Sequence, residues 1–231
     1  DNIFSFDFRS IQLSDLESIY LWIMEHWFDY VIISGWEPSL HPDFVSIIEF
    51  FQQRDIYVVV VNNGTWLDKH DYSWVDKNKI TWYISYHGLE EPYNKITGSN
   101  DWSKVTDNIA RMSEIFDEVI LRCVVNSINI TTIPAYREFI KTRLPWVYSE
   151  FVLLEDFRFA HIQKVAVPIW AFYKAVLPFI NDAHVLLDGG QACIHPRLFQ
   201  MARYKFDPLV NTMIWLVKKK KTWEIIYDVK K

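Results

Sequence analysis

Polar side chains follow five apolar runs of this 231-residue sequence, at the point where each run ends. The five polar sets are Ser34-Gly35-Trp36-Glu37-Pro38, Asn62-Asn63-Gly64, Ser85-Tyr86-His87-Gly88, Asn126-Ser127 and Glu155-Asp156. Such residues can face a ligand, and acids such as Glu37 and Glu155 can transfer protons. They can also be structural, because Gly supplies positive φ at turns and Asn caps helices. Their shared position favours a ligand site, since function concentrates on loops held by a rigid scaffold.

The elements between these sets alternate between strands and helices. Apolar runs predict strands over 30–34, 56–61, 80–86, 118–125 and 148–155, and amphipathic segments predict helices over 14–27, 43–54, 102–116 and 133–144. Ser14 and Glu17 are expected to form a capping box for the first helix. Strands that are apolar throughout and separated by helices indicate a mostly parallel sheet. The prediction is an α/β fold, a partial (βα)6-type TIM-like barrel, in which the polar sets meet on one rim.

The alternation of strands and helices breaks after Phe157. We expect residues 1–157 to form the barrel core, and residues 158–231 to form a C-terminal extension that completes the barrel and supplies the substrate side. Within the extension, residues 167–180 read as a helix bent near Pro178, and residues 222–229 as a closing edge strand. Polar candidates for contact with a substrate are His161, Asp188, Gln191, His195 and Arg197.

Composition narrows the possible functions. A net charge of -5 offers no general basic surface, so no nucleic-acid partner is expected. Because no apolar stretch reaches about 18 residues, no membrane partner is expected either. Two cysteines suit a reducing cytoplasm rather than a disulfide scaffold. Cys123 reads as a buried small hydrophobe, whereas Cys193, close to a Gly-Gly turn and His195, could bind a metal or face a substrate.

Four stretches resemble the radical S-adenosylmethionine (SAM) superfamily, in order between Ser14 and Leu144. The stretch IISGWEPSLHPDF is similar to the Gly-Gly-Glu-Pro turn and the helix start that follows it, and VVVVNNGTW to the next strand, which often ends in Thr-Asn-Gly. The stretch YISYHGLEEPYNKITG resembles the fourth strand with its Ser-x-Asp-Gly ending, and LRCVVNSINI the fifth. Two positions depart from the pattern: Trp36 stands where Gly is usual, and His87 where many members have Asp.

The resemblance implies reductive cleavage of SAM to a 5′-deoxyadenosyl radical, which abstracts hydrogen from an unidentified small-molecule or peptide substrate. It also implies a 4Fe–4S cluster and an electron donor such as flavodoxin or ferredoxin. The Glu-Pro turn would face the methionyl ammonium, the serine after the fourth strand would meet the ribose or the carboxylate, and Arg122 or Asn126 would hold the carboxylate. The implied cofactor-binding residues are Gly35, Trp36, Glu37, Pro38, Asn63, Ser85, Arg122 and Asn126.

The cluster of this superfamily is held by a Cys-x3-Cys-x2-Cys motif, which the sequence does not contain. No metal ligand is therefore predicted among its residues. We expect the motif to lie upstream of Asp1, in which case the protein is a radical SAM enzyme. The alternatives are a degenerate, cluster-less barrel that acts as a binding module, and an unrelated (βα) barrel enzyme that uses rim acids.

Overall fold

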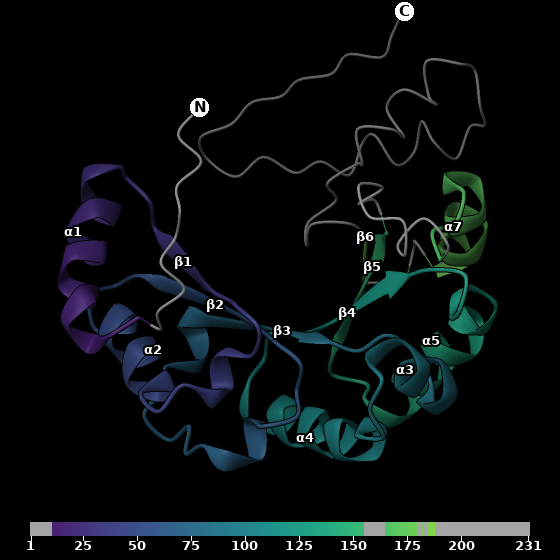
Figure 1. Cartoon of the computed structure of the whole chain (residues 1–231), viewed down its shortest axis with the longest axis horizontal. Coiled ribbons are helices and arrows are strands. Elements are labelled where there is room, and N and C mark those ends of the chain that lie inside the picture. Colours follow the sequence, from purple (N-terminus) through teal and green to yellow (C-terminus); the bar gives the residue numbers. More distant parts are fainter. Residues whose placement is uncertain (1–10, 155–164, 180–181, 183, 188–231) are drawn as a thin grey trace, which may run out of the picture.

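The computed structural model of the chain describes residues 11–154, 165–179, 182 and 184–187. Its strands form one six-stranded sheet in sequence order, and every neighbouring pair is parallel. The strands are β1 (Tyr30–Ile33), β2 (Tyr57–Asn62), β3 (Ile80–Ser85), β4 (Val119–Val125), β5 (Tyr148–Leu153) and β6 (Val185–Leu187). Figure 1 shows the sheet as an arc that does not close between β1 and β6. The predicted α/β partial TIM-like barrel is confirmed.

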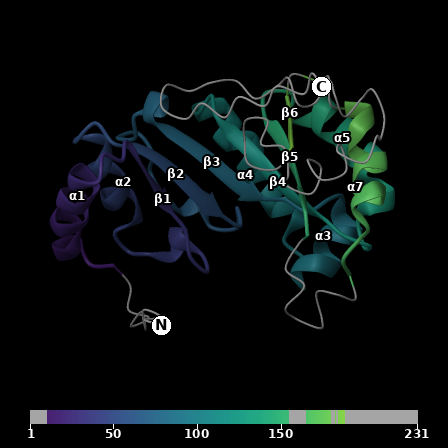
Figure 2. The same cartoon turned by 90° about the horizontal axis from the view of Figure 1, so that it is seen from above.

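Helices connect the strands, because each parallel strand can begin only after the chain has returned to the end of the sheet where the previous strand began. The α-helices are α1 (Leu16–Glu25), α2 (Phe44–Gln52), α3 (Glu90–Thr97), α4 (Trp102–Ile115), α5 (Ile133–Arg143) and α7 (Ile169–Val176). The 3-10 turns are η1 (Leu13–Asp15), η2 (Pro38–Leu40), η3 (Leu67–Lys69), η4 (Lys77–Lys79), η5 (Ile130–Thr132) and η6 (Leu177–Phe179). Figures 1 and 2 place α2, α4, α3 and α5 along the convex side, with α1 and α7 near the two ends.

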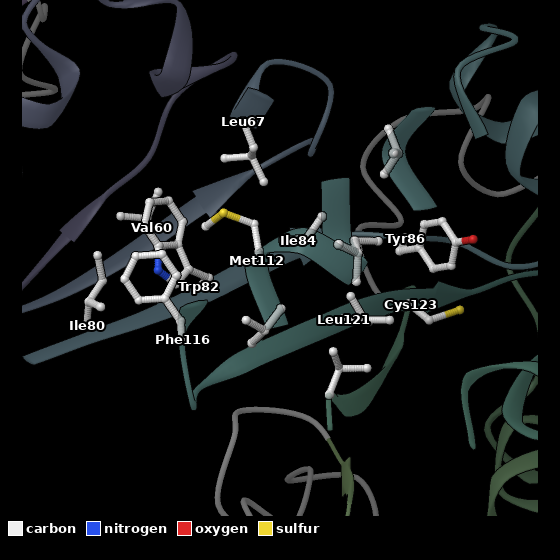
Figure 3. Packing of buried hydrophobic residues seen from close by; sticks show 14 of the residues in the cluster. Val60, Leu67, Ile80, Trp82, Ile84, Tyr86, Met112, Phe116, Leu121 and Cys123 are labelled. Atoms are coloured by element: carbon white, nitrogen blue, oxygen red, sulfur yellow. The ribbon is translucent and has the colours of Figure 1, made fainter. Parts of the chain in front are cut away.

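The hydrophobic core lies between the convex side of the sheet and these helices. Alternate strand residues such as Val60, Trp82 and Leu121 are fully buried there, because side chains alternate between the two faces of a strand. Trp82 packs against Phe116 from the end of α4, with ring centroids 5.2 Å apart (Figure 3). The large aromatic content of the sequence is used here, since aromatic side chains bury much apolar area each.

The concave side of the sheet carries the remaining strand residues, and several of them are polar. Tyr83, Ser85 and Arg122 are half-buried, whereas their sequence neighbours face the helices. The strand register pairs Ser85 with Arg122, and Arg122 with Glu150. A row of polar side chains therefore crosses three strands on the face that the helices leave open.

Two local predictions were wrong. The expected capping box of Ser14 and Glu17 is not formed, because Ser14 lies inside η1, where Gln12 and Asp15 form a capping box instead. Glu17 pairs with Arg54, with 3.1 Å between nitrogen and oxygen. In addition, α3 was not predicted. Its first turn holds Pro92, which is tolerated there because the first helical N–H groups need no intrahelical partner.

The bend predicted at Pro178 lies in η6, directly after α7. The division at residue 157 stays a prediction, since residues 155–164 lie outside the described part of the chain. The predicted edge strand over 222–229 lies outside it as well. So do several candidate residues, namely Glu155, Asp156, His161, Asp188, Gln191, Cys193, His195 and Arg197.

Candidate functional site

The turn after β1 is built around the Glu37 side chain. Its carboxylate accepts hydrogen bonds from the Ser39 N–H at 3.0 Å, from the Ser39 hydroxyl, and from the Asn63 N–H at 2.7 Å. Glu37 is only 7% exposed, and Pro38 directly after it begins η2. The glutamate therefore closes its own turn and ties it to the loop after β2. It does not reach outward as an acid on the rim.

The backbone of the same turn offers free acceptors. Among the described residues, none donates a hydrogen bond to the carbonyl oxygens of Gly35 and Trp36, whereas the next carbonyl, that of Glu37, accepts from the Leu40 N–H. The Trp36 side chain is 100% exposed. Beside this turn, a groove of about 860 Å³ is lined by apolar side chains of α1, β1 and α2. Carbonyl oxygens at such a mouth can bind a cation, because a cation needs acceptors.

The loop after β2 is held in a fixed position. Asn62 and Asn63 each accept, through the side-chain oxygen, a backbone N–H two residues ahead, at 2.8 and 2.9 Å. Gly64 has φ +78, and a Cβ on it would lie only 2.8 Å from Val105 of α4. No larger residue fits there, so α4 packs directly under the loop. Asn63, predicted to bind the cofactor, therefore has its N–H and its side-chain oxygen engaged within the protein.

The concave face holds a charged group at its centre. Arg122 donates from Nε to the carboxylate of Glu150, which is fully buried. The guanidinium carbon lies 4.4 Å from the centroid of the Tyr83 ring, and the Arg122 side chain is 33% exposed. No described residue accepts a hydrogen bond from its two terminal nitrogens. Arg122 is thus anchored along one edge and can present its other edge to an anion.

Of the two residues predicted to hold a carboxylate, Asn126 is placed differently from Arg122. It is buried, and its side-chain oxygen accepts from the Ile128 N–H at 2.9 Å. Its own N–H donates to the side chain of Asn129 at 2.9 Å. Asn126 thus shapes the turn after β4, and Arg122 is the one with donors to spare. Ser85 ends β3 on the concave face beside Arg122.

Sequence reasoning assigned no role to Glu150 or Asn129, and it named His87 only within a polar set and as a departure from the superfamily pattern. Glu150 is the one charged residue of the mostly apolar β5 strand, and that position was the available signal for a buried charge. Asn129, fully buried, donates to the His87 carbonyl at 2.8 Å and joins the loops after β3 and β4. Burial lowers the pKa of the His87 imidazole to about 4, so this half-buried side chain is neutral near pH 7.

The described residues fit SAM and do not fit an iron–sulfur cluster. The carbonyl oxygens of Gly35 and Trp36 can accept hydrogen bonds from the ammonium of an amino acid. The terminal nitrogens of Arg122 can donate to its carboxylate. In contrast, no group of three or more His, Cys, Asp or Glu in the described ranges could hold a metal. Cys123 is fully buried, which raises the pKa of its thiol and disfavours the thiolate that binds iron. In the same part of the chain, no helix is long and apolar enough to cross a bilayer.

Comparison with known proteins gives consistent matches. The family model of the Radical SAM superfamily matches residues 4–140. The GTP 3′,8-cyclases of Vibrio cholerae (strain ATCC 39541) and Vibrio vulnificus (strain YJ016) are 32% and 31% identical to this chain over 118 residues. That stretch is 49% of this chain and 35% of either relative, so the match spans about a third of the relatives' length.

Solved structures resemble the fold at low sequence identity. One is anSMEcpe with bound AdoMet and the Kp18Cys peptide, with a TM-score of 0.58 and 19% identity over 78% of this chain and 56% of that chain. Another is SuiB of Streptococcus suis bound to its precursor peptide SuiA, with a TM-score of 0.59 and 12% identity over 90% and 48% of the two chains. At these identities the likeness concerns the fold alone.

Proposed function

This chain belongs to the radical SAM superfamily, and on that premise we propose that it binds SAM across the carboxyl ends of β1 to β4. SAM and a 4Fe–4S cluster are the cofactors of the superfamily. Because the chain belongs to this superfamily, the alternative that it is an unrelated (βα) barrel enzyme is wrong. The proposed reaction is hydrogen abstraction from a small-molecule or peptide substrate by a 5′-deoxyadenosyl radical. The cluster, when bound, supplies the electron that cleaves SAM.

The observation that carries this proposal is the placement of opposite partners around one face. Among the described residues, the carbonyls of Gly35 and Trp36 accept no hydrogen bond, and the two terminal nitrogens of Arg122 donate none. The ammonium of SAM is the complement of the first pair, and its carboxylate is the complement of the second. Ser85, next to Arg122 in the register, adds a hydroxyl for the carboxylate or the ribose.

Glu37, Pro38 and Asn63 support this site through the backbone. Pro38 fixes φ at the start of η2, and the Asn63 N–H holds the Glu37 carboxylate. No described cationic side chain lies within ion-pair distance of that carboxylate, so its charge favours an ammonium at the adjacent carbonyls. Asn126 acts in the same indirect way, by shaping the turn beyond β4.

Calorimetric titration of SAM tests the proposed site. We expect Arg122→Gln to weaken the binding of SAM about tenfold, because a charge-assisted hydrogen bond to the carboxylate is lost. Decarboxylated SAM, which keeps the ammonium, should bind this variant and the unmodified protein alike. Equal losses for both ligands would show that Arg122 does not serve the carboxylate.

One observation favours a second function. The sequence has only two cysteines, Cys123 and Cys193, which cannot form the triplet that holds the cluster. A cluster-less member would bind SAM or a related nucleoside as a binding module, without turnover. Iron and sulfide analysis of the anaerobically purified full-length protein separates the two functions. About four irons per chain would support the radical enzyme, and no iron after reconstitution would support the binding module.

The remaining features of the proposed enzyme follow from its class. The electron donor would be a flavodoxin or a ferredoxin, and the protein would work in the cytoplasm. Residues 158–231 would complete the barrel and contact the substrate, with His161, His195 and Arg197 among the candidate contacts. Mass spectrometry of 5′-deoxyadenosine, formed only with the true substrate class present, would test this assignment.

A further inference from the structure

The hydrogen-bond ladder between β3 and β4 ends on a side chain. The Tyr86 N–H donates to the Arg122 carbonyl at 3.0 Å, as a parallel pair requires. In a regular ladder the Val124 N–H would then donate to the Tyr86 carbonyl, but that carbonyl accepts from the Tyr136 hydroxyl at 2.9 Å. The Val124 N–H donates instead to Nδ1 of His87, at 3.3 Å. The imidazole thus takes the place of a backbone carbonyl at the rim.

This hydrogen bond fixes which ring nitrogen of His87 carries the proton. Because Nδ1 accepts, a neutral imidazole must carry its hydrogen on Nε2. The low pKa caused by burial keeps the ring in this form at neutral pH. The backbone of the residue is held as well, since Asn129 donates to the His87 carbonyl at 2.8 Å and to the Val124 carbonyl at 2.9 Å.

The Nε2–H group belongs to the concave face. Ile84 and Tyr86 are fully buried on the helix side, so the alternate residues Ser85 and His87 face the other way. Arg122 is the register partner of Ser85 on that face. In the described part of the chain no group accepts a hydrogen bond from Nε2. Ser85, His87 and Arg122 therefore offer three donors on this face, and the charge of Glu150, the register partner of Arg122, is paired with Arg122.

We propose that His87 supplies a third donor for the carboxylate of SAM, through Nε2–H, beside Ser85 and Arg122. This inference rests on the proposed function. An aspartate at this position would add negative charge to an anion site. The neutral His87 ring, held by Val124 and Asn129, adds a donor without that charge.

Three variants separate binding from structure. His87→Asn keeps an acceptor near the position of Nδ1 and loses the donor at Nε2. His87→Gln keeps a donor near Nε2 and loses the acceptor for the Val124 N–H. His87→Asp has the shape of the Asn variant and adds a negative charge. His184→Phe, at a half-buried position directly before β6, serves as a control outside the proposed site.

Titration calorimetry measures the affinity of each variant for SAM and for decarboxylated SAM. Thermal unfolding measures its stability. We expect His87→Asn to bind SAM about tenfold more weakly, His87→Asp more weakly still, and decarboxylated SAM to bind all variants alike. His87→Gln should melt at a lower temperature than the unmodified protein but retain most of its affinity for SAM.

Two results would overturn the inference alone. One is SAM affinity that does not change in His87→Asn while the unmodified protein binds SAM. The other is an equal loss of affinity for both ligands, which would make His87 a structural residue. Failure of the unmodified protein to bind SAM would overturn the proposed function, and this inference with it.

Discussion

At the scale of single residues, the sequence predicted which residue types lie at the strand ends. It did not predict the direction in which their side chains point. The glutamate and proline after Gly35 were placed correctly at the end of a strand. That the Glu37 carboxylate turns inward to Ser39 and Asn63 depends on how close the next loop lies, and no local pattern encodes that distance. The acceptors left open are therefore backbone carbonyls, which every residue type has.

Replacing Glu37 with Gln tests its supporting role. The amide has one acceptor oxygen and directs an NH2 group at donors, so at least one buried N–H loses its partner. We expect the free energy of unfolding to fall by roughly 1–3 kcal/mol and SAM to bind about tenfold more weakly. Urea unfolding and calorimetry measure both effects. Glu114→Gln, at an exposed position of α4, should change neither.

Gly35→Val tests whether the turn depends on its backbone conformation. Gly35 has φ +155, and a Cβ built on it meets no atom within 4 Å, so any loss must come from backbone strain and not from a clash. We expect a loss of about 1–3 kcal/mol in stability and weaker SAM binding. Gly98 has φ +69 and also open space around it. Gly98→Val should therefore lower stability, and a matching loss of SAM affinity there would contradict the local role of Gly35.

At the scale of elements, the sequence predicted the β1 to β5 strands because each is a mostly apolar run between polar turns. The helix α3 was missed because its proline and two acids resemble a turn. The pairing of Arg122 with Glu150 could not be predicted either, since it depends on the register between β4 and β5, which one sequence does not reveal. The sequence thus placed the candidate site residues at strands and the loops after them, but did not reveal the residues that they contact.

Arg122→Met should destabilise the sheet. Removing the guanidinium breaks the pair between Arg122 and the fully buried Glu150, and breaking a buried ion pair costs roughly 3 kcal/mol. The double variant Arg122→Met with Glu150→Leu should recover part of this loss, because it removes the buried charge as well. Urea unfolding of both variants measures the difference. A double variant less stable than the single one would show that Glu150 is supported mainly by other groups.

The link between α5 and the segment before β6 should weaken in acid. Burial alone would raise the pKa of Asp182, but hydrogen bonds from the His184 N–H and from Arg137 and the charge of Arg137 lower it overall. A carboxyl with a lowered folded-state pKa stabilises the protein above its unfolded pKa of about 3.9 and loses this contribution as pH falls through the folded value. Asp182→Asn should therefore flatten the acid end of the stability profile, and an unchanged profile would rule this link out.

At the scale of the whole molecule, the sheet is an arc with two ends. In the described chain, β1 has no strand on its outer side, and its Tyr30 and Ile32 side chains are exposed. The groove beside β1 is lined by α1, β1 and α2, whereas the polar row of β3 to β5 lies on the concave face of the arc that Figure 1 shows.

An open arc, unlike a closed cylinder, is not braced against bending by a continuous ring of hydrogen bonds. Its curvature near the rim is set by cross-ties between consecutive loops: Glu37 binds the loop after β1 to Asn63, and Asn129 binds the loops after β3 and β4. These two hydrogen-bonded links hold neighbouring loops at a fixed separation. Cutting either one changes the span between the carbonyls beside β1 and the donors on β4, without removing a single group that touches the ligand.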